Sequence, residues 1–125
     1  MTGPVDLPFA PPLDIILNLP TPLSVNRTRK IDWRNYKKVA AWQRQADAAF
    51  LMQKRGLAPP ILGRYEIILT LADGSQIDAD NVAKQVIDIA KRFQLVQDDS
   101  PTYMRRVVIE FGDVEGCRVT IRAMA

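Results

Sequence analysis

The segment IDADNVAKQVIDIAKRFQLVQDD, residues 77–99, holds the side chains of this chain that are best suited to chemistry. Asp78 and Asp80 are two positions apart, so in extended backbone their carboxylates point the same way. Asp80 also suits the N-cap of a helix, where exposed amides favour negative charge. Lys84 and Asp88 follow at intervals of four, so one helix face carries all three of Asp80, Lys84 and Asp88. A ladder of ion pairs along that face is one explanation of the spacing.

A bound cation is the other explanation, because a second acidic pair, Asp98 and Asp99, follows the expected helix end. A helix over 80–93 is about 20 Å long, and an extended return over 93–99 covers about the same length. The return can therefore bring Asp99 beside Asp78 and Asp80. Several carboxylates with open coordination positions suit Mg²⁺, with Mn²⁺ as a substitute, and such an ion activates water and polarises phosphodiesters. Spacing alone leaves both explanations open.

The composition limits the other chemistries. The chain has no histidine, which removes histidine-based nucleophilic catalysis and histidine-ligated zinc. Its one cysteine, Cys117, lies in the alternating run CRVTIRAMA and is interpreted as a packed thiol; it excludes an internal disulfide and favours an intracellular protein. No apolar stretch is long enough to cross a membrane. Hydrolysis would have to depend on carboxylates and a lysine.

The elements that must position these residues follow from hydrophobic periodicity. With 125 residues the chain is expected to form a single domain over 13–125, after a proline-rich, poorly ordered segment over 1–12. Alternation predicts strands, and helical spacing predicts helices. The predicted strands are 13–19, 65–72, 103–111 and 117–124, and the predicted helices are 34–54 and 80–93. This order indicates an α+β fold, a mixed β-sheet packed with two main helices.

The charges are unevenly distributed along the chain. Seven of the 17 Lys and Arg residues lie between Arg27 and Arg44, whereas nine of the 14 acidic residues lie between Asp73 and Glu115. Arg27, Arg29 and Lys30 fall in an expected loop close to Trp33 and Tyr36, a combination that favours nucleic acid. A solvated helix face explains the later basic residues equally well.

The combined pattern resembles the RusA-type Holliday-junction resolvases, small endodeoxyribonucleases common in phage and prophage. The residues that carry the resemblance are D-x-D-N (Asp78, Asp80, Asn81), Lys84, Asp88, the run Asp98-Asp99-Ser100, and an upstream P-x-S-V-N segment (Pro22, Ser24, Val25, Asn26) before basic residues. These positions span most of residues 20–103. Members of the family often have glycine before the DD pair, where this chain has Gln94-Leu95-Val96-Gln97.

The resemblance implies a cytoplasmic homodimer, of bacterial or phage origin, that binds four-way junction DNA and nicks opposed strands with Mg²⁺ or Mn²⁺. It implies that Asp78, Asp80 and Asp99 are catalytic, metal-binding carboxylates and that Lys84 is the catalytic lysine. The supporting residues it implies are Asn81, Asp88 and Asp98, and the implied DNA contacts are Asn26, Arg27, Arg29 and Lys30. A two-fold dimer suits the chemistry, since resolving a junction takes two symmetric cuts.

Two other functions fit the same residues. In one, the chain is a DNA- or RNA-binding module whose acidic residues only cap helices. In the other, it is a small Mg²⁺-dependent nuclease without preference for junctions.

Overall fold

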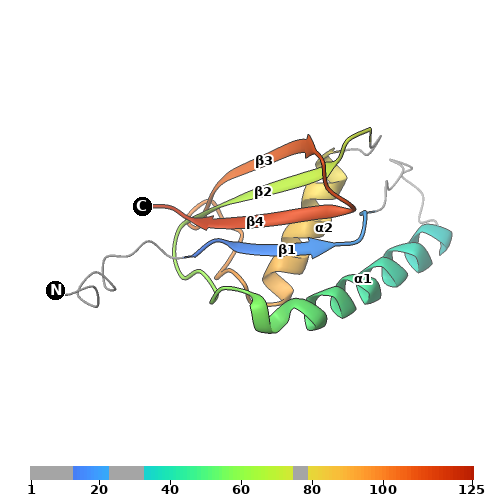
Figure 1. Cartoon of the computed structure of the whole chain (residues 1–125), viewed down its shortest axis with the longest axis horizontal. Helices are drawn as coiled ribbons and strands as arrows, with labels where there is room; N and C mark the ends of the chain where they lie inside the picture. The colour runs from blue at the N-terminus through green and yellow to red at the C-terminus, as the bar shows by residue number, and fades with distance from the viewer. Residues whose placement is uncertain (1–12, 23–32, 75–78) are drawn as a thin grey trace.

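The computed structural model describes residues 13–22, 33–74 and 79–125. The predicted segment 1–12 and the expected loop with Arg27, Arg29 and Lys30 lie outside these residues. The described elements are β1 (Ile15–Leu19), α1 (Trp33–Gln53), a short 3-10 helix (Lys54–Gly56), β2 (Tyr65–Ala72), α2 (Ala79–Arg92), β3 (Met104–Gly112) and β4 (Cys117–Ala123). The predicted α+β fold, a mixed sheet with two main helices, is confirmed (Figure 1).

The four strands form one sheet in the order β1-β4-β2-β3. β4 pairs antiparallel with both β1 and β2, whereas β2 and β3 are parallel. Parallel neighbours need a long crossover, and α2 supplies it. β2 and β3 therefore start at the same end of the sheet, with Tyr65 opposite Met104, and end together, with Ala72 opposite Gly112. The chain enters α2 from one end of the sheet and leaves it towards the other.

Both helices cover the same face of the sheet, because apolar side chains alternate along each central strand (Figure 1). The apolar stripe of α2 follows helical spacing, and Trp42 is the first buried residue among the α1 side chains that the structure describes, 37–53. One core cluster results, and its buried members on the helices are Trp42, Ala46, Phe50, Val82, Val86, Ile89 and Ala90. The rings of Phe50 and Phe93 stack with centroids 4.0 Å apart, which joins the C-terminal ends of the two helices.

The end of α2 decides where the following acidic residues lie. Gln94 has a φ of 58°, a left-handed conformation common just after a helix, and the Leu95 amide donates to the Ala90 carbonyl. The chain then forms an isolated parallel bridge between Val96 and Ile61. It continues towards the start of β3 instead of returning along the helix (Figure 1).

The two edge strands of the sheet differ. On β1, the Gln53 side chain makes the two backbone hydrogen bonds at Asn18 that a neighbouring strand would make. Its Oε1 accepts from the Asn18 amide at 2.9 Å, and its Nε2 donates to the Asn18 carbonyl at 2.7 Å. Within the described ranges, no element pairs with the outer edge of β3. Val107 and Phe111 on that strand are 40% and 50% exposed. An unpaired edge with exposed apolar side chains is a site for pairing with another chain.

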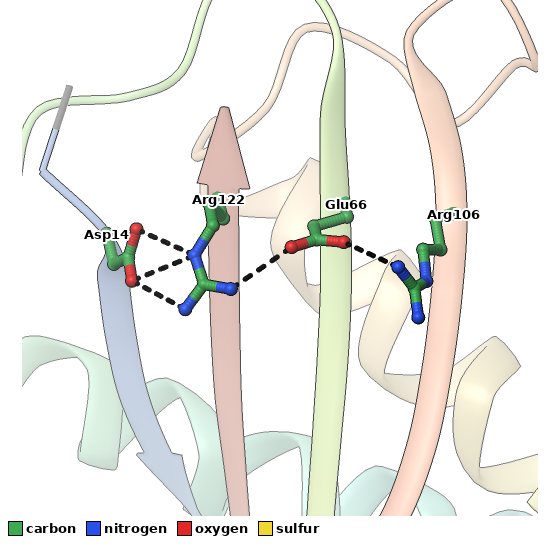
Figure 2. A network of polar contacts seen from close by, with 4 residues as sticks. All are labelled: Asp14, Glu66, Arg106 and Arg122. Carbon is green, nitrogen blue, oxygen red and sulfur yellow. Dashed lines mark hydrogen bonds and ion pairs between the residues drawn. The ribbon is translucent and has the colours of Figure 1, made fainter. Parts of the chain in front are cut away.

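The face of the sheet away from the helices carries a row of alternating charges that runs from Asp14, just before β1, across β4 and β2 to β3 (Figure 2). The Arg122 guanidinium donates to Asp14 at 3.0 Å and to Glu66 at 3.2 Å. Arg106 lies 3.8 Å from the other Glu66 oxygen. Glu66 is the buried charged residue among those described, and Arg122 is its closest partner.

Replacing Arg122 should therefore cost more stability than replacing Arg106. Arg122→Met leaves the buried Glu66 carboxylate with only the longer contact and is expected to lower the Tm by about 5 °C. Arg106→Met should change the Tm little, because this cation is exposed and its contact is long. Differential scanning fluorimetry measures both. The double variant Arg122→Met/Glu66→Met should melt above Arg122→Met, and a lower Tm in the double variant would contradict this explanation.

Candidate active site

An exposed lysine holds the second acidic pair. The Lys91 ammonium lies 3.1 Å from Asp99 Oδ1 and 3.6 Å from Asp98 Oδ1. The side chains of all three residues are partly exposed, from 36% to 45%. The hydrogen bond and the charge of Asp99 raise the pKa of Lys91. The backbone amide of Asp99 lowers the pKa of Asp98, and the Ser100 hydroxyl and Lys91 add to that effect. The ammonium of Lys91 therefore lies within ion-pair distance of both carboxylates.

Tyr65, the first residue of β2, fixes the backbone beside this pair. Its hydroxyl donates to the Asp98 carbonyl at 2.7 Å. The ring is buried, with 1% of the residue exposed. Burial, with the charges of Asp99 and Asp98 adding to it, raises the pKa of Tyr65 to about 12. The acidic pair therefore lies at the end of the sheet where β2 and β3 begin.

The first part of the motif lies at the other end of α2. Asp80 and Asn81 belong to the first turn of that helix, and their side chains lie outside the described part of the structure. Asp78 lies outside the described residues altogether. Lys84 and Asp88 are exposed on the solvent side of α2, and no ion pair joins these two described residues. That part of the expected ladder is absent.

The prediction that residues 93–99 return along α2 towards Asp80 is wrong for a single chain. Lys91, which holds Asp99, follows Asp80 by 11 positions, or about 16 Å along the helix axis. The turn at Gln94 and the bridge at Val96 direct the segment to the start of β3, away from the start of α2. Asp98 and Asp99 therefore come together with Lys91, and the structure does not bring them to Asp80.

A metal ion would need more ligands than this pair. No group of three or more acidic, cysteine or histidine side chains gathers among the described residues. The carboxylate oxygens of Asp98 and Asp99 are of the type that Mg²⁺ prefers, and Lys91 supplies the positive charge beside them. Two carboxylates supply only part of the ligands that such an ion takes. Completing such a site takes carboxylates from elsewhere.

The expected DNA contacts, Asn26, Arg27, Arg29 and Lys30, all lie outside the described residues.

Two residues of the site were missed from the sequence. Lys91 lies seven positions after Lys84, so helical periodicity places it on the same side of α2 and near the acidic pair. That spacing could have identified it. Tyr65 gave no such signal, because its contact with Asp98 depends on the parallel pairing of β2 and β3.

Comparison of the chain with protein-family models and with curated proteins gave no match. In the described part of the chain, neither helix is long and apolar enough to cross a membrane.

The raised pKa of Tyr65 predicts a pH dependence of stability. The pKa is about 12 in the folded chain and about 10 in the unfolded chain. The stabilisation that follows from this difference is complete below pH 10 and is lost as the pH rises through 12. Tyr65→Phe removes the hydroxyl and should cost about 1 kcal/mol at pH 8. When the pH rises from 8 to 11.5, the free energy of unfolding of Tyr65→Phe should fall by about 1–2 kcal/mol less than that of the original chain. Urea unfolding at both pH values tests this, and equal losses would contradict it.

Proposed function

We propose that this chain is one subunit of a metal-dependent endodeoxyribonuclease of the RusA type that resolves four-way DNA junctions by paired nicks. The observation that carries the proposal is the arrangement of Asp98 and Asp99 around Lys91. Two adjacent carboxylates are held outside the core and share one exposed ammonium, so the group keeps a net negative charge. A divalent cation can replace that ammonium without disturbing the core. The protein would then act on DNA in the cytoplasm of a bacterium, encoded by the host or by a phage.

A second copy of the chain can supply the missing carboxylates. Asp98 and Asp99 precede the start of β3, whereas α2, whose first turn contains Asp80, follows β2 in the chain. The end of β2 lies beside the end of β3. If two copies pair antiparallel along β3, the start of one β3 lies beside the end of the other. Asp99 of each subunit then lies at the same end of the joined sheet as the partner's Asp78 and Asp80. Each complete site would combine residues of both chains.

The edges of the sheet favour β3 for this pairing. The Gln53 amide already occupies both backbone groups of Asn18 on the β1 edge. The β3 edge carries the exposed side chains Val107 and Phe111 and can continue the sheet. A two-fold axis between the β3 strands of the two copies makes the interface self-complementary and produces two equivalent sites. Two sites facing one junction match the requirement for two symmetric cuts.

In this proposal each group of side chains has a separate role in binding the metal, the phosphate or the DNA. Asp78, Asp80 and Asp99 would hold Mg²⁺, or Mn²⁺ in its place, and that ion would polarise the phosphodiester and acidify a water molecule. Lys84 is exposed one turn into α2 and would neutralise charge that develops on the phosphate. Asn81, Asp88 and Asp98 would support this arrangement. The basic residues from Asn26 to Lys30 would bind the arms of the junction.

A synthetic four-way junction tests the proposal. Incubated with the protein and Mg²⁺, it should be nicked at symmetric positions, and Asp80→Asn and Lys84→Ala should abolish nicking while both variants still bind the junction. Binding without cutting in both Mg²⁺ and Mn²⁺ would favour a nucleic-acid-binding module. Equal cutting of linear duplex would favour a nuclease without junction preference.

A further inference from the structure

Hydrogen bonds on both sides fix the backbone that carries the acidic pair. The Tyr65 hydroxyl donates to the Asp98 carbonyl at 2.7 Å. Just after the pair, the backbone amides of Tyr103 and Met104 each donate to the Ser100 carbonyl at 2.9 Å. None of these bonds involves a lysine. The backbone of the pair is therefore held without the ammonium that lies against its carboxylates.

Lys91 is joined to this pair by exposed ion pairs alone. It belongs to the last turn of α2, and its ammonium lies 3.1 Å from Asp99 Oδ1 and 3.6 Å from Asp98 Oδ1. Its side chain is 41% exposed, and ion pairs so open to solvent contribute little to stability because water and salt screen them. Since the backbone is fixed by other bonds, the main effect of Lys91 at this place is its charge.

The oxygens that Lys91 contacts are also the oxygens that a metal ion would bind. An ammonium and a divalent cation cannot both lie against the same Oδ1 atoms, because their like charges repel. A metal ion must therefore displace the ammonium, and the stabilisation from the two ion pairs is then subtracted from metal binding. The displacement itself is easy, since the long lysine side chain can turn its ammonium into solvent.

We propose that Lys91 is a competing cation that sets the concentration of divalent metal at which Asp98 and Asp99 bind the ion. The inference rests on the proposed function, in which Asp99 is a metal ligand, and it adds a regulation of that site. Competition from Lys91 keeps the metal affinity of a lone chain low, so the ion binds when the partner's Asp80 adds its carboxylate. Metal binding and the pairing of two chains are thereby coupled.

A purely structural role of Lys91 predicts the opposite effect on metal binding. If the lysine served mainly to hold the two carboxylates in place, removing it would loosen them and weaken the binding of a metal ion. If it competes with the metal, removing it strengthens that binding. The sign of the change in affinity therefore distinguishes the two roles.

Binding of Mn²⁺ to the full chain, without DNA, measures that sign. Electron paramagnetic resonance detects free Mn²⁺, so the loss of its signal gives the Kd. Lys91→Gln should lower the Kd by about 5-fold or more, because the metal no longer has to break the two exposed ion pairs. Lys91→Arg keeps the charge and should not lower the Kd.

Lys54→Gln is the matched control, because Lys54 is an exposed lysine of the 3-10 helix and does not belong to the acidic pair or its ion pairs. It removes the same charge from the chain and should leave the Kd within about 2-fold of the original. An equal gain in Lys54→Gln would show that only the net charge matters, and it would overturn the inference.

The remaining outcomes separate this inference from the proposed function. Unchanged or weaker Mn²⁺ binding by Lys91→Gln overturns the inference, and so does a gain that persists in Lys91→Gln/Asp99→Asn, because the metal would then bind elsewhere. If junctions are cut but Lys91→Gln leaves the Kd unchanged, this inference alone fails. If Lys91→Gln binds Mn²⁺ more tightly through Asp99 while no junction is cut, the nuclease proposal fails and the competing cation stands.

Discussion

Mixing the inactive variants Asp80→Asn and Asp99→Asn is expected to restore nicking of a four-way junction. If each site combines Asp80 of one chain with Asp99 of the other, a mixed dimer contains one doubly altered site and one intact site. Neither variant alone has an intact site. The restored activity is therefore a property of the mixed dimer and would not arise if each chain built its own site.

The amount of restored activity can be calculated. After free exchange of equal amounts of the two variants, half of the dimers are mixed and half of their sites are intact, so about one quarter of the original sites are restored. These dimers have a single working site, so single nicks should exceed symmetric pairs. Gel analysis of a junction labelled on two strands measures both quantities.

Two controls make the result specific. Asp78→Asn mixed with Asp80→Asn should stay inactive, because both substitutions fall in the same half of the site. A brief treatment with urea before mixing should raise the restored activity if exchange of subunits is slow. Absence of nicking after verified exchange would contradict a shared site, and the separation of Asp99 from Asp80 within one chain would then count against the nuclease itself.

The elements of the fold could be predicted from the sequence because each depends on local periodicity. Alternation over residues 65–72 and the helical stripe that begins at Val82 each identify an element, and the ends differ from the structure by two residues or fewer. The order of strands was not predicted, since it depends on contacts between segments far apart in the chain. The cap of Gln53 on β1 belongs to the same class of long-range contact.

The candidate site shows the same limit. The sequence identified Asp98 and Asp99 as an acidic pair just past the helix end, and in the structure both are partly exposed and form ion pairs with one cation. It did not predict that Lys91 would be that cation. Chain length alone allows residues 93–99 to return along α2. The parallel pairing of β2 and β3 instead requires these residues to stay at the end of the sheet where β3 begins, away from the start of α2.

Placing charge on the β3 edge should separate the subunits. Val107→Lys/Phe111→Lys adds two ammonium groups to the proposed interface, where a two-fold axis would bring four of them together. The dimer dissociation constant is expected to rise by about 30-fold or more. Analytical ultracentrifugation should then find a particle of 14.1 kDa in place of one of twice that mass. Junction nicking should be lost with the dimer although Asp78, Asp80, Lys84 and Asp99 are unchanged.

The control for this variant adds the same charge elsewhere. Ile16 and Leu62 are 49% and 82% exposed, and neither lies on β3, so Ile16→Lys/Leu62→Lys should remain dimeric and active. Circular dichroism melting checks that both double variants stay folded. A β3 variant that is monomeric and still nicks junctions would show that one chain holds a complete site. A β3 variant that stays dimeric would place the interface on another surface and remove the geometric reason for combining Asp99 with the partner's Asp80.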